Sequence, residues 1–305
     1  MEVNEMEEIK EIKSVTIVPF TLMNSALSAI LGLIYALILI IVLGLVAFFI
    51  PSTVSAIIGL LLTLAVAIIL ILPTGLFLVN IAHSFLQALI YNLLVPRLGG
   101  IKLKLDEMEE IKEIPIIPLS LMVSTLNTIY VLILMLIVAP ILMLGMQTAA
   151  IAAISTTSSL PEFGGLSALG IIGIIMMIIG IPIIVFISSF INTAIMALIY
   201  NFLAPKIGGI RLKFNSVQNN LFELKKIEPI PLALILAVVT TILNLIFSIP
   251  NITIYFTLKE PLFAIAYLIG NIVGTFIIVF IMSTVTALIY NFLRPTIGGI
   301  ELELE

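Results

Sequence analysis

The side chains in this sequence that could do chemistry inside a membrane are hydroxyls and amides, because its six long apolar runs hold no Asp, Glu, Lys or Arg. Small or polar residues recur two, six and nine positions after Pro19, Pro118 and Pro231. They are Thr21, Ser25 and Ser28; Ser120, Ser124 and Asn127; and Ala233, Ala237 and Thr240. These offsets lie on one helical face. The stripe favours close helix packing or, alternatively, a polar ring of Ser28, Asn127 and Thr240 around a pseudo-threefold axis.

Most catalytic chemistry is excluded by composition. The chain has no cysteine and one histidine, so thiolate catalysis and a transition-metal centre lack ligands. Paired intramembrane acids and a His-Glu-x-x-His motif are also absent from the sequence. A net charge of −4 with no basic stripe argues against nucleic acid as a partner. We expect a protein that is not an enzyme and that uses no metal or cofactor.

His83 does not belong to a repeated site, because Asn192 and Met282 occupy the corresponding positions. We expect its ring to hydrogen-bond to Asn80, Ser84 or Gln87, rather than to bind a ligand or shuttle protons.

One segment occurs three times, at 88–104, 197–213 and 287–303, and reads Ala-Leu-Ile-Tyr-Asn-x-Leu-x-Pro-x-x-Gly-Gly-Ile-x-Leu-x. The octapeptide Glu5–Ile12 also recurs unchanged at Glu107–Ile114. Such repeats indicate one unit written three times. The expected copies are 1–106, 107–215 and 216–305, which together form one membrane domain.

The composition is that of a membrane protein. Hydrophobic residues make up 62% of the chain and charged residues 10%, whereas soluble domains average roughly 45–50% and about 25%. Apolar runs lie near 19–50, 54–95, 118–147, 165–204, 231–249 and 262–293. Two crossings per copy place every lysine and arginine except Lys259 on one side, which the positive-inside rule assigns to the cytoplasm. We therefore expect an all-α polytopic membrane protein with six transmembrane helices and both termini cytoplasmic.

The second runs exceed the roughly 20 residues that a bilayer requires. We expect Pro73 and Pro182 to kink them, because proline removes a helical hydrogen bond. The segment 148–164 is expected to be the longest external loop, with 251–261 as its counterpart in the third copy.

Each repeated tail ends in alternating residues, at 101–105, 210–214 and 300–304, a strand pattern. The heads around 9–12, 111–114 and 224–227 would supply partner strands. We expect a small β-rich cytoplasmic cap of up to six strands; the alternative is that the heads are solvated acidic turns.

Two further sets of residues recur with the tail. The first is a small-x-x-x-small pair, which lets membrane helices approach closely: Ser84 and Ala88, Thr193 and Ala197, Ser283 and Ala287. The second is a Tyr-Asn pair where the helix leaves the membrane: Tyr91 and Asn92, Tyr200 and Asn201, Tyr290 and Asn291. We expect the tyrosines in an aromatic belt, and the asparagines either capping the helix end, bonding to the Gly-Gly turn, or forming a ring at the cytoplasmic mouth.

The tail and head together resemble a family of small prokaryotic membrane proteins, a two-helix transmembrane domain of unknown function. The resemblance implies the two-crossing unit and the cytoplasmic strands, and it carries no activity or site residues. Heavy use of Ile, Glu and Lys without Cys is also typical of thermophiles.

Three functions fit these patterns. The first is a pore or passive transporter for small solutes or ions along a pseudo-threefold axis, since pores can select by diameter and lining groups without charge. The second is a structural scaffold whose cap docks a cytoplasmic protein partner. The third is binding of membrane lipid or another hydrophobic ligand between the helices.

Overall fold

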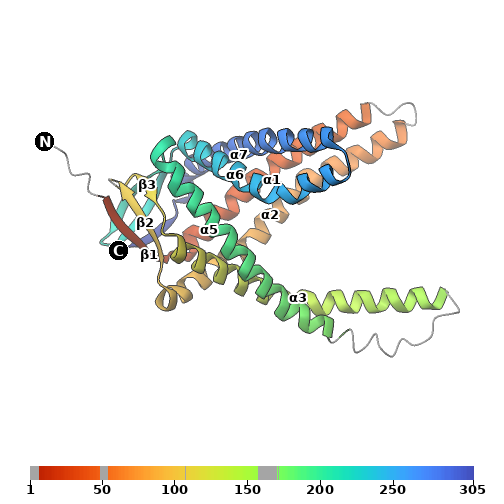
Figure 1. The fold of residues 1–305 in the computed structure, drawn as a ribbon, viewed down its shortest axis with the longest axis horizontal. Helices are drawn as coiled ribbons and strands as arrows, with labels where there is room; N and C mark the ends of the chain where they lie inside the picture. Colours follow the sequence, from red (N-terminus) through yellow and green to blue (C-terminus); the bar gives the residue numbers. More distant parts are fainter. Residues whose placement is uncertain (1–6, 49–53, 107, 157–169, 171) are drawn as a thin grey trace.

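The computed structural model describes residues 7–48, 54–106, 108–156, 170 and 172–305. Within these residues, six helices are long and apolar enough to cross a membrane. The chain is therefore a multi-pass membrane protein. The helices form three hairpins that diverge from a small β-barrel at one end (Figure 1).

The first hairpin comprises α1 (Ile17–Phe48) and α2 (Val54–Leu98), and the third comprises α6 (Pro229–Thr257) and α7 (Pro261–Ile297). The second comprises α3 (Ile116–Thr156) and α5 (Ile181–Ile207), with a π-helical turn η1 (Met176–Gly180) before α5. Lipid chains cannot hydrogen-bond to backbone N–H and C=O groups, but a helix pairs these groups within itself. The apolar runs are therefore stable in the membrane as helices.

Each hairpin's second helix stops at a glycine in the left-handed region. Gly99, Gly208 and Gly298 have φ values of 79°, 88° and 84°. Their N–H groups donate to carbonyls four residues earlier, which ends the helix and turns the chain into a strand.

Six strands close into a barrel in chain order: β1 (Glu7–Val15), β2 (Ile101–Asp106), β3 (Glu110–Glu113), β4 (Ile210–Gln218), β5 (Leu221–Ile227) and β6 (Glu301–Leu304). All pairs are antiparallel, and β1 pairs with β6, so the first and last strands join. The expected six strands are confirmed, and closure removes the free sheet edges that an open cap would leave.

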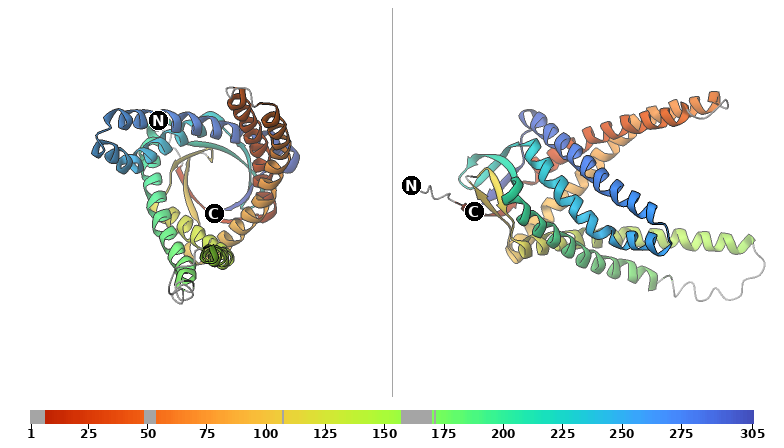
Figure 2. Two further views of the ribbon diagram at one scale, coloured as in Figure 1. Left: turned by 90° about the vertical axis from the view of Figure 1, so that its right-hand side faces the viewer. Right: turned by 45° about the horizontal axis from the view of Figure 1, so that its top comes forward.

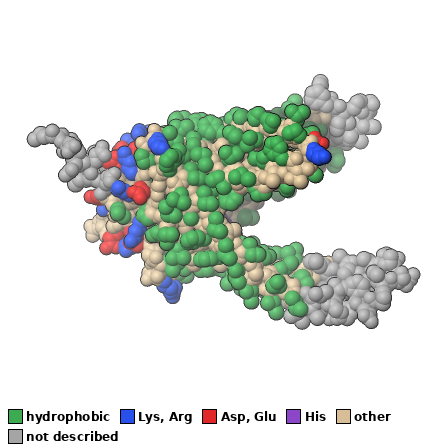
Figure 3. Space-filling view, in the orientation of Figure 1, with side chains coloured by type: hydrophobic (Ala, Val, Ile, Leu, Met, Phe, Trp, Pro, Cys, Tyr) green, Lys and Arg blue, Asp and Glu red, His purple; other side chains and the backbone are tan. Residues whose placement is uncertain are grey.

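One face of the barrel is apolar. Directly paired residues share a face, and alternate residues along a strand do too. By this rule the apolar face carries Ile12, Ile101, Leu103, Leu105, Ile111, Ile210, Leu212, Phe214, Phe222, Leu224, Leu302 and Leu304. Polar residues on that face include Ser216 of β4, which pairs with Phe222, and Glu8 and Lys10 of β1, which form an ion pair. Figure 3 shows charged side chains gathered at the barrel end, with one further charged spot at the far tip between α6 and α7.

The buried core lies where successive hairpins meet. Tyr91 of α2 packs with Met122 and Leu126 of α3, and Tyr200 of α5 packs with Ile235 and Val239 of α6. Tyr290 of α7 packs with Met23 and Leu27 of α1, which closes the ring. Figure 2 shows the three hairpins arranged around the ring of strands.

Two expected loops are helical. Residues 148–156 continue α3, and 251–257 continue α6. Alanine is the strongest helix former, and the Ala-rich stretch after Thr148 extends the helix on propensity. Residues 157–164 of the expected long loop lie outside the described residues.

The two helix prolines behave differently. α2 runs through Pro73 as one helix. At Pro182 the chain departs from α-helical bonding, because η1 immediately precedes it, and such π-turns accommodate a missing backbone donor.

Candidate functional site

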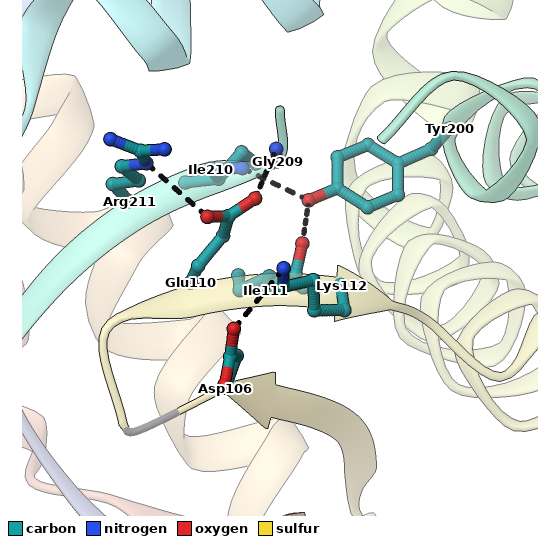
Figure 4. A network of polar contacts seen from close by, with 8 residues as sticks. All are labelled: Asp106, Glu110, Ile111, Lys112, Tyr200, Gly209, Ile210 and Arg211. Carbon is teal, nitrogen blue, oxygen red and sulfur yellow. Dashed lines mark hydrogen bonds and ion pairs between the residues drawn. The ribbon is translucent and has the colours of Figure 1, made fainter. Parts of the chain in front are cut away.

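Three tyrosine hydroxyls bridge paired strands where the barrel meets the helices. Tyr200 Oη donates to the Ile111 carbonyl at 2.5 Å and accepts from the Ile210 N–H at 3.0 Å (Figure 4). The same pair of bonds links Tyr91 to Ile12 and Ile101, and Tyr290 to Leu224 and Ile300. All three rings are buried rather than lying in a lipid-facing aromatic belt.

The asparagine that follows each tyrosine holds the end of the neighbouring head strand. Asn201 Oδ1 accepts from the Ile114 N–H, and its Nδ2 donates to the Ile114 carbonyl, both at 2.9 Å. Asn92 makes the same two bonds with Val15, and Asn291 with Ile227. The partner is therefore the head strand, and not the Gly-Gly turn or the helix end.

We call each tyrosine-asparagine pair, together with the strand ends that it binds, a node. Each node also contains one glutamate, which sequence reasoning missed. The Gly209 N–H donates to Glu110 Oε1 at 2.8 Å; Gly100 donates likewise to Glu11 at 2.6 Å, and Gly299 to Glu223 at 2.7 Å. A sequence signal existed, because each glutamate lies eight residues before Pro19, Pro118 or Pro231.

The tyrosine hydrogen bonds show that the heads align differently from what the repeated octapeptide indicates. The structural counterpart of Ile111 is Ile12, since both accept from the equivalent tyrosine. The repeated octapeptide instead aligns Ile111 with Ile9. The Glu-Ile-Lys triplet occurs twice in succession, starting at Glu8 and Glu11, so sequence identity selected the wrong one.

Each glutamate also faces a cation. Arg294 Nε donates to Glu223 at 2.9 Å, the Arg211–Glu110 pair spans 3.3 Å, and the Lys13–Glu11 pair spans 3.3 Å. Arg294 is the main cause of a lowered pKa at Glu223, and the Gly100 N–H is the main cause of a lowered pKa at Glu11. The carboxylates of Glu223 and Glu11 are therefore held ionised as structural acceptors.

Glycine is required at the second position of each Gly-Gly turn. A Cβ on Gly209 would lie 2.1 Å from the Ile111 carbonyl oxygen, and one on Gly100 would lie 2.1 Å from the Ile12 oxygen. Such contacts are far inside van der Waals distance, so any larger residue would separate the two strands.

Polar groups inside the membrane pair within hairpins. Asn80 Nδ2 donates to Ser28, and Asn127 Nδ2 donates to Ser189 at 2.9 Å. Ser28 and Asn127 occupy the same position in the first helix of their hairpins, and Asn80 and Ser189 occupy the same position in the second helix. The serine and the asparagine are therefore exchanged between the two helices. In the third hairpin the bond lies one turn farther from the barrel, where Asn244 donates to Asn271 and Thr275. Thr240 of the expected polar ring is half-buried.

The small residues of the expected packing pairs lie mostly in the interior. Ser84, Ala88, Thr193, Ala197 and Ala287 are buried, and Ser283 is half-buried. His83 does not bond to the residues that we expected; its ring meets Tyr130 of α3 edge-on, with centroids 4.7 Å apart.

A pocket of about 260 Å³, which we call the axial pocket, lies between the barrel and helices α1, α2 and α3. Its walls are the apolar strand residues Ile12, Ile101 and Leu302, together with side chains of α1, α2 and α3. Two amides, Gln87 and Asn127, also line it. Gln87 makes no hydrogen bond within the described part of the chain, so its amide is available to a bound molecule.

Comparisons with protein-family models, curated proteins and solved structures found no match. Across the described residues, no group of three or more His, Asp or Glu side chains could hold a metal ion.

Proposed function

We propose that this membrane protein holds a small, hydrophobic, weakly polar molecule in the axial pocket beneath its barrel. The observation that carries this proposal is the lining: largely apolar, with the unpartnered Gln87 amide among its few polar groups. Ligand sites are typically apolar pockets with a few polar groups that fix orientation. A pocket between helices and a barrel mouth is also one of the places where such sites occur.

Dodecanol is a suitable probe, because it combines an apolar chain with one hydroxyl. Native mass spectrometry of the purified protein should show one bound dodecanol per chain. Val123→Phe, which fills the pocket, should abolish binding, whereas Val66→Phe on the exposed side of α2 should retain it. Equal binding by both variants would exclude the axial pocket as the site.

A passive pore along the axis of the barrel is the second candidate. It is favoured by the closed ring of strands and by the amides of Gln87 and Asn127 in the pocket below. Liposomes containing the protein should then release trapped glycerol faster than empty liposomes, and Val123→Phe should slow the release. Dodecanol binding without glycerol flux would favour the ligand-binding function over the pore.

A further inference from the structure

A second pocket lies between the second and third hairpins, within the membrane-spanning segments. It has a volume of about 520 Å³ and is lined by Ile184, Ile187, Ser188, Ile191 and Asn192 of α5 and by Phe247 of α6. We call it the α5–α6 groove. It shares no lining residue with the axial pocket.

The one strong hydrogen-bonding group left free in the α5–α6 groove is the amide of Asn192. Ser188 Oγ already donates to the Ile184 carbonyl at 2.7 Å. Asn192 is exposed and makes no hydrogen bond to any described residue. An amide left unpaired in an apolar environment costs several kcal/mol, so a lipid oxygen within reach of Asn192 would be a favourable partner.

The corresponding place between α2 and α3 is filled by protein. His83 and Asn192 each lie eight residues before the bridging tyrosine, and Tyr130 and Leu243 each lie twelve residues after the repeated proline. The rings of His83 and Tyr130 contact each other there. Asn192 and Leu243 carry no aromatic ring and cannot make this contact, and the groove lies beside Asn192.

Asn192 lies near the barrel-side boundary of the hydrocarbon layer. In the third hairpin, Lys259 and Glu260 are exposed at the far end and must stay outside that layer. About 20 helical residues cross roughly 30 Å of hydrocarbon, so a crossing that begins at Pro261 ends near Ile281. Met282 is the position that corresponds to Asn192. This is the depth at which a lipid's chains are joined to its glycerol.

We propose that the α5–α6 groove binds one bilayer lipid. One chain lies along Ile184, Ile187, Ile191 and Phe247, and an oxygen that links the chain to glycerol accepts a hydrogen bond from Asn192 Nδ2. The proposal does not depend on the function assigned to the axial pocket.

The test uses full-length protein reconstituted in palmitoyl-oleoyl phosphatidylcholine nanodiscs, moved to mild detergent, and examined by native mass spectrometry. The wild type should retain one phospholipid per chain. Asn192→Leu should lower the retained fraction about two- to tenfold, the effect of one hydrogen bond. The double variant Asn192→His, Leu243→Tyr, which copies the His83–Tyr130 pair, should abolish retention.

Met282→Leu is the matched control, because it changes the equivalent position in the third hairpin; it should retain lipid like the wild type. Dodecanol binding should be unchanged in Asn192→Leu, which separates this site from the axial pocket. The proposal would be overturned if the wild type retained no lipid or if Asn192→Leu retained as much lipid as the wild type. It would also be overturned if Met282→Leu lost as much lipid as Asn192→Leu. Should the double variant not fold, Asn192→Leu decides alone.

Discussion

At the scale of single residues, the repeated Tyr, Asn and Glu side chains bind backbone rather than one another. A strand end at the barrel's helix side leaves carbonyl and N–H groups without strand partners, in surroundings with little water. Tyr200 supplies one donor and one acceptor to such a pair, and Asn201 does the same for Ile114. These residues therefore set where each strand stops and how the barrel sits on its helices.

Tyr200→Phe should destabilise the protein by about 1–3 kcal/mol, because it leaves the Ile111 carbonyl and the Ile210 N–H buried without their partner. Denaturant-induced unfolding in detergent measures the change. Tyr35→Phe is the control, since Tyr35 is 43% exposed and makes no hydrogen bond to the described residues. Equal stability of both variants would show that the hydroxyl bridge contributes nothing.

Glu223 makes stability depend on pH. The pKa of Glu223 is lowered in the folded protein from its ordinary value of 4.5. A carboxylate with a lowered folded pKa stabilises the fold above its unfolded pKa, and the contribution is lost as pH falls through the folded value. Wild-type stability should therefore begin to fall near pH 4.5 and continue to fall below it.

Glu223→Gln should be about 1–3 kcal/mol less stable than the wild type at pH 7, because the charged partner of Arg294 is gone. It should also lose less stability on acidification. Thermal unfolding recorded from pH 7 to pH 3 measures both effects, with Glu260→Gln at the exposed far loop as the control. An acid response identical to that of the wild type would contradict the assignment.

At the scale of elements, strands from all three head–tail pairs are joined edge to edge. The pairs β1–β2, β3–β4 and β5–β6 each join a head to its own tail, while β2–β3, β4–β5 and β6–β1 join neighbouring copies. The last link returns the chain to its start, because the backbones of Glu305 and Glu11 exchange two hydrogen bonds. The barrel therefore has no edge strand.

A circular permutant tests this ring directly. Joining Glu305 to Glu7 by a short flexible linker and opening the chain between Asn219 and Asn220 should leave the six strands in place. Stability should stay within about 1 kcal/mol of the wild type, since the broken link is a turn and the new one spans adjacent strands. Circular dichroism and thermal unfolding measure the outcome; a permutant that loses β-structure would show that strand order along the chain matters.

At the scale of the whole molecule, the hairpins are held together at the barrel and separate beyond it (Figure 1). The space-filling view is hollowed between two arms of the molecule (Figure 3). Hydrophobic side chains cover these arms, and many of them are exposed. In a bilayer such surfaces are covered by lipid chains, and the α5–α6 groove would be in contact with these chains.

Orientation in the membrane can be measured cleanly because the chain has no cysteine. Lys102→Cys and Lys213→Cys, on β2 and β4, should be protected from a membrane-impermeant maleimide in intact cells and labelled after lysis. Lys259→Cys, at the opposite end, should be labelled in intact cells. Labelling of positions 102 and 213 from opposite sides would contradict the six-crossing topology.

The sequence by itself determined the three hairpins and the strands that cap them. Apolar runs without charge form helices in lipid, because a helix satisfies its own backbone hydrogen bonds. Alternation after each Gly-Gly pair indicates a strand with one buried face. Helix ends were less predictable, since helix propensity carried α3 through Thr156 and α6 through Thr257, beyond the expected boundaries.

Only the tertiary structure decided which partner each polar side chain would take. Asn127 bonds to Ser189 of its own hairpin, and Glu110 reaches Gly209 across ninety-nine positions of sequence. Local patterns fix a residue's element and face, whereas its partner depends on how the elements are brought together. The head register shows this most clearly, because Ile9 and Ile12 both lie in a Glu-Ile-Lys triplet, and it is Ile12 that accepts from the tyrosine hydroxyl below the barrel.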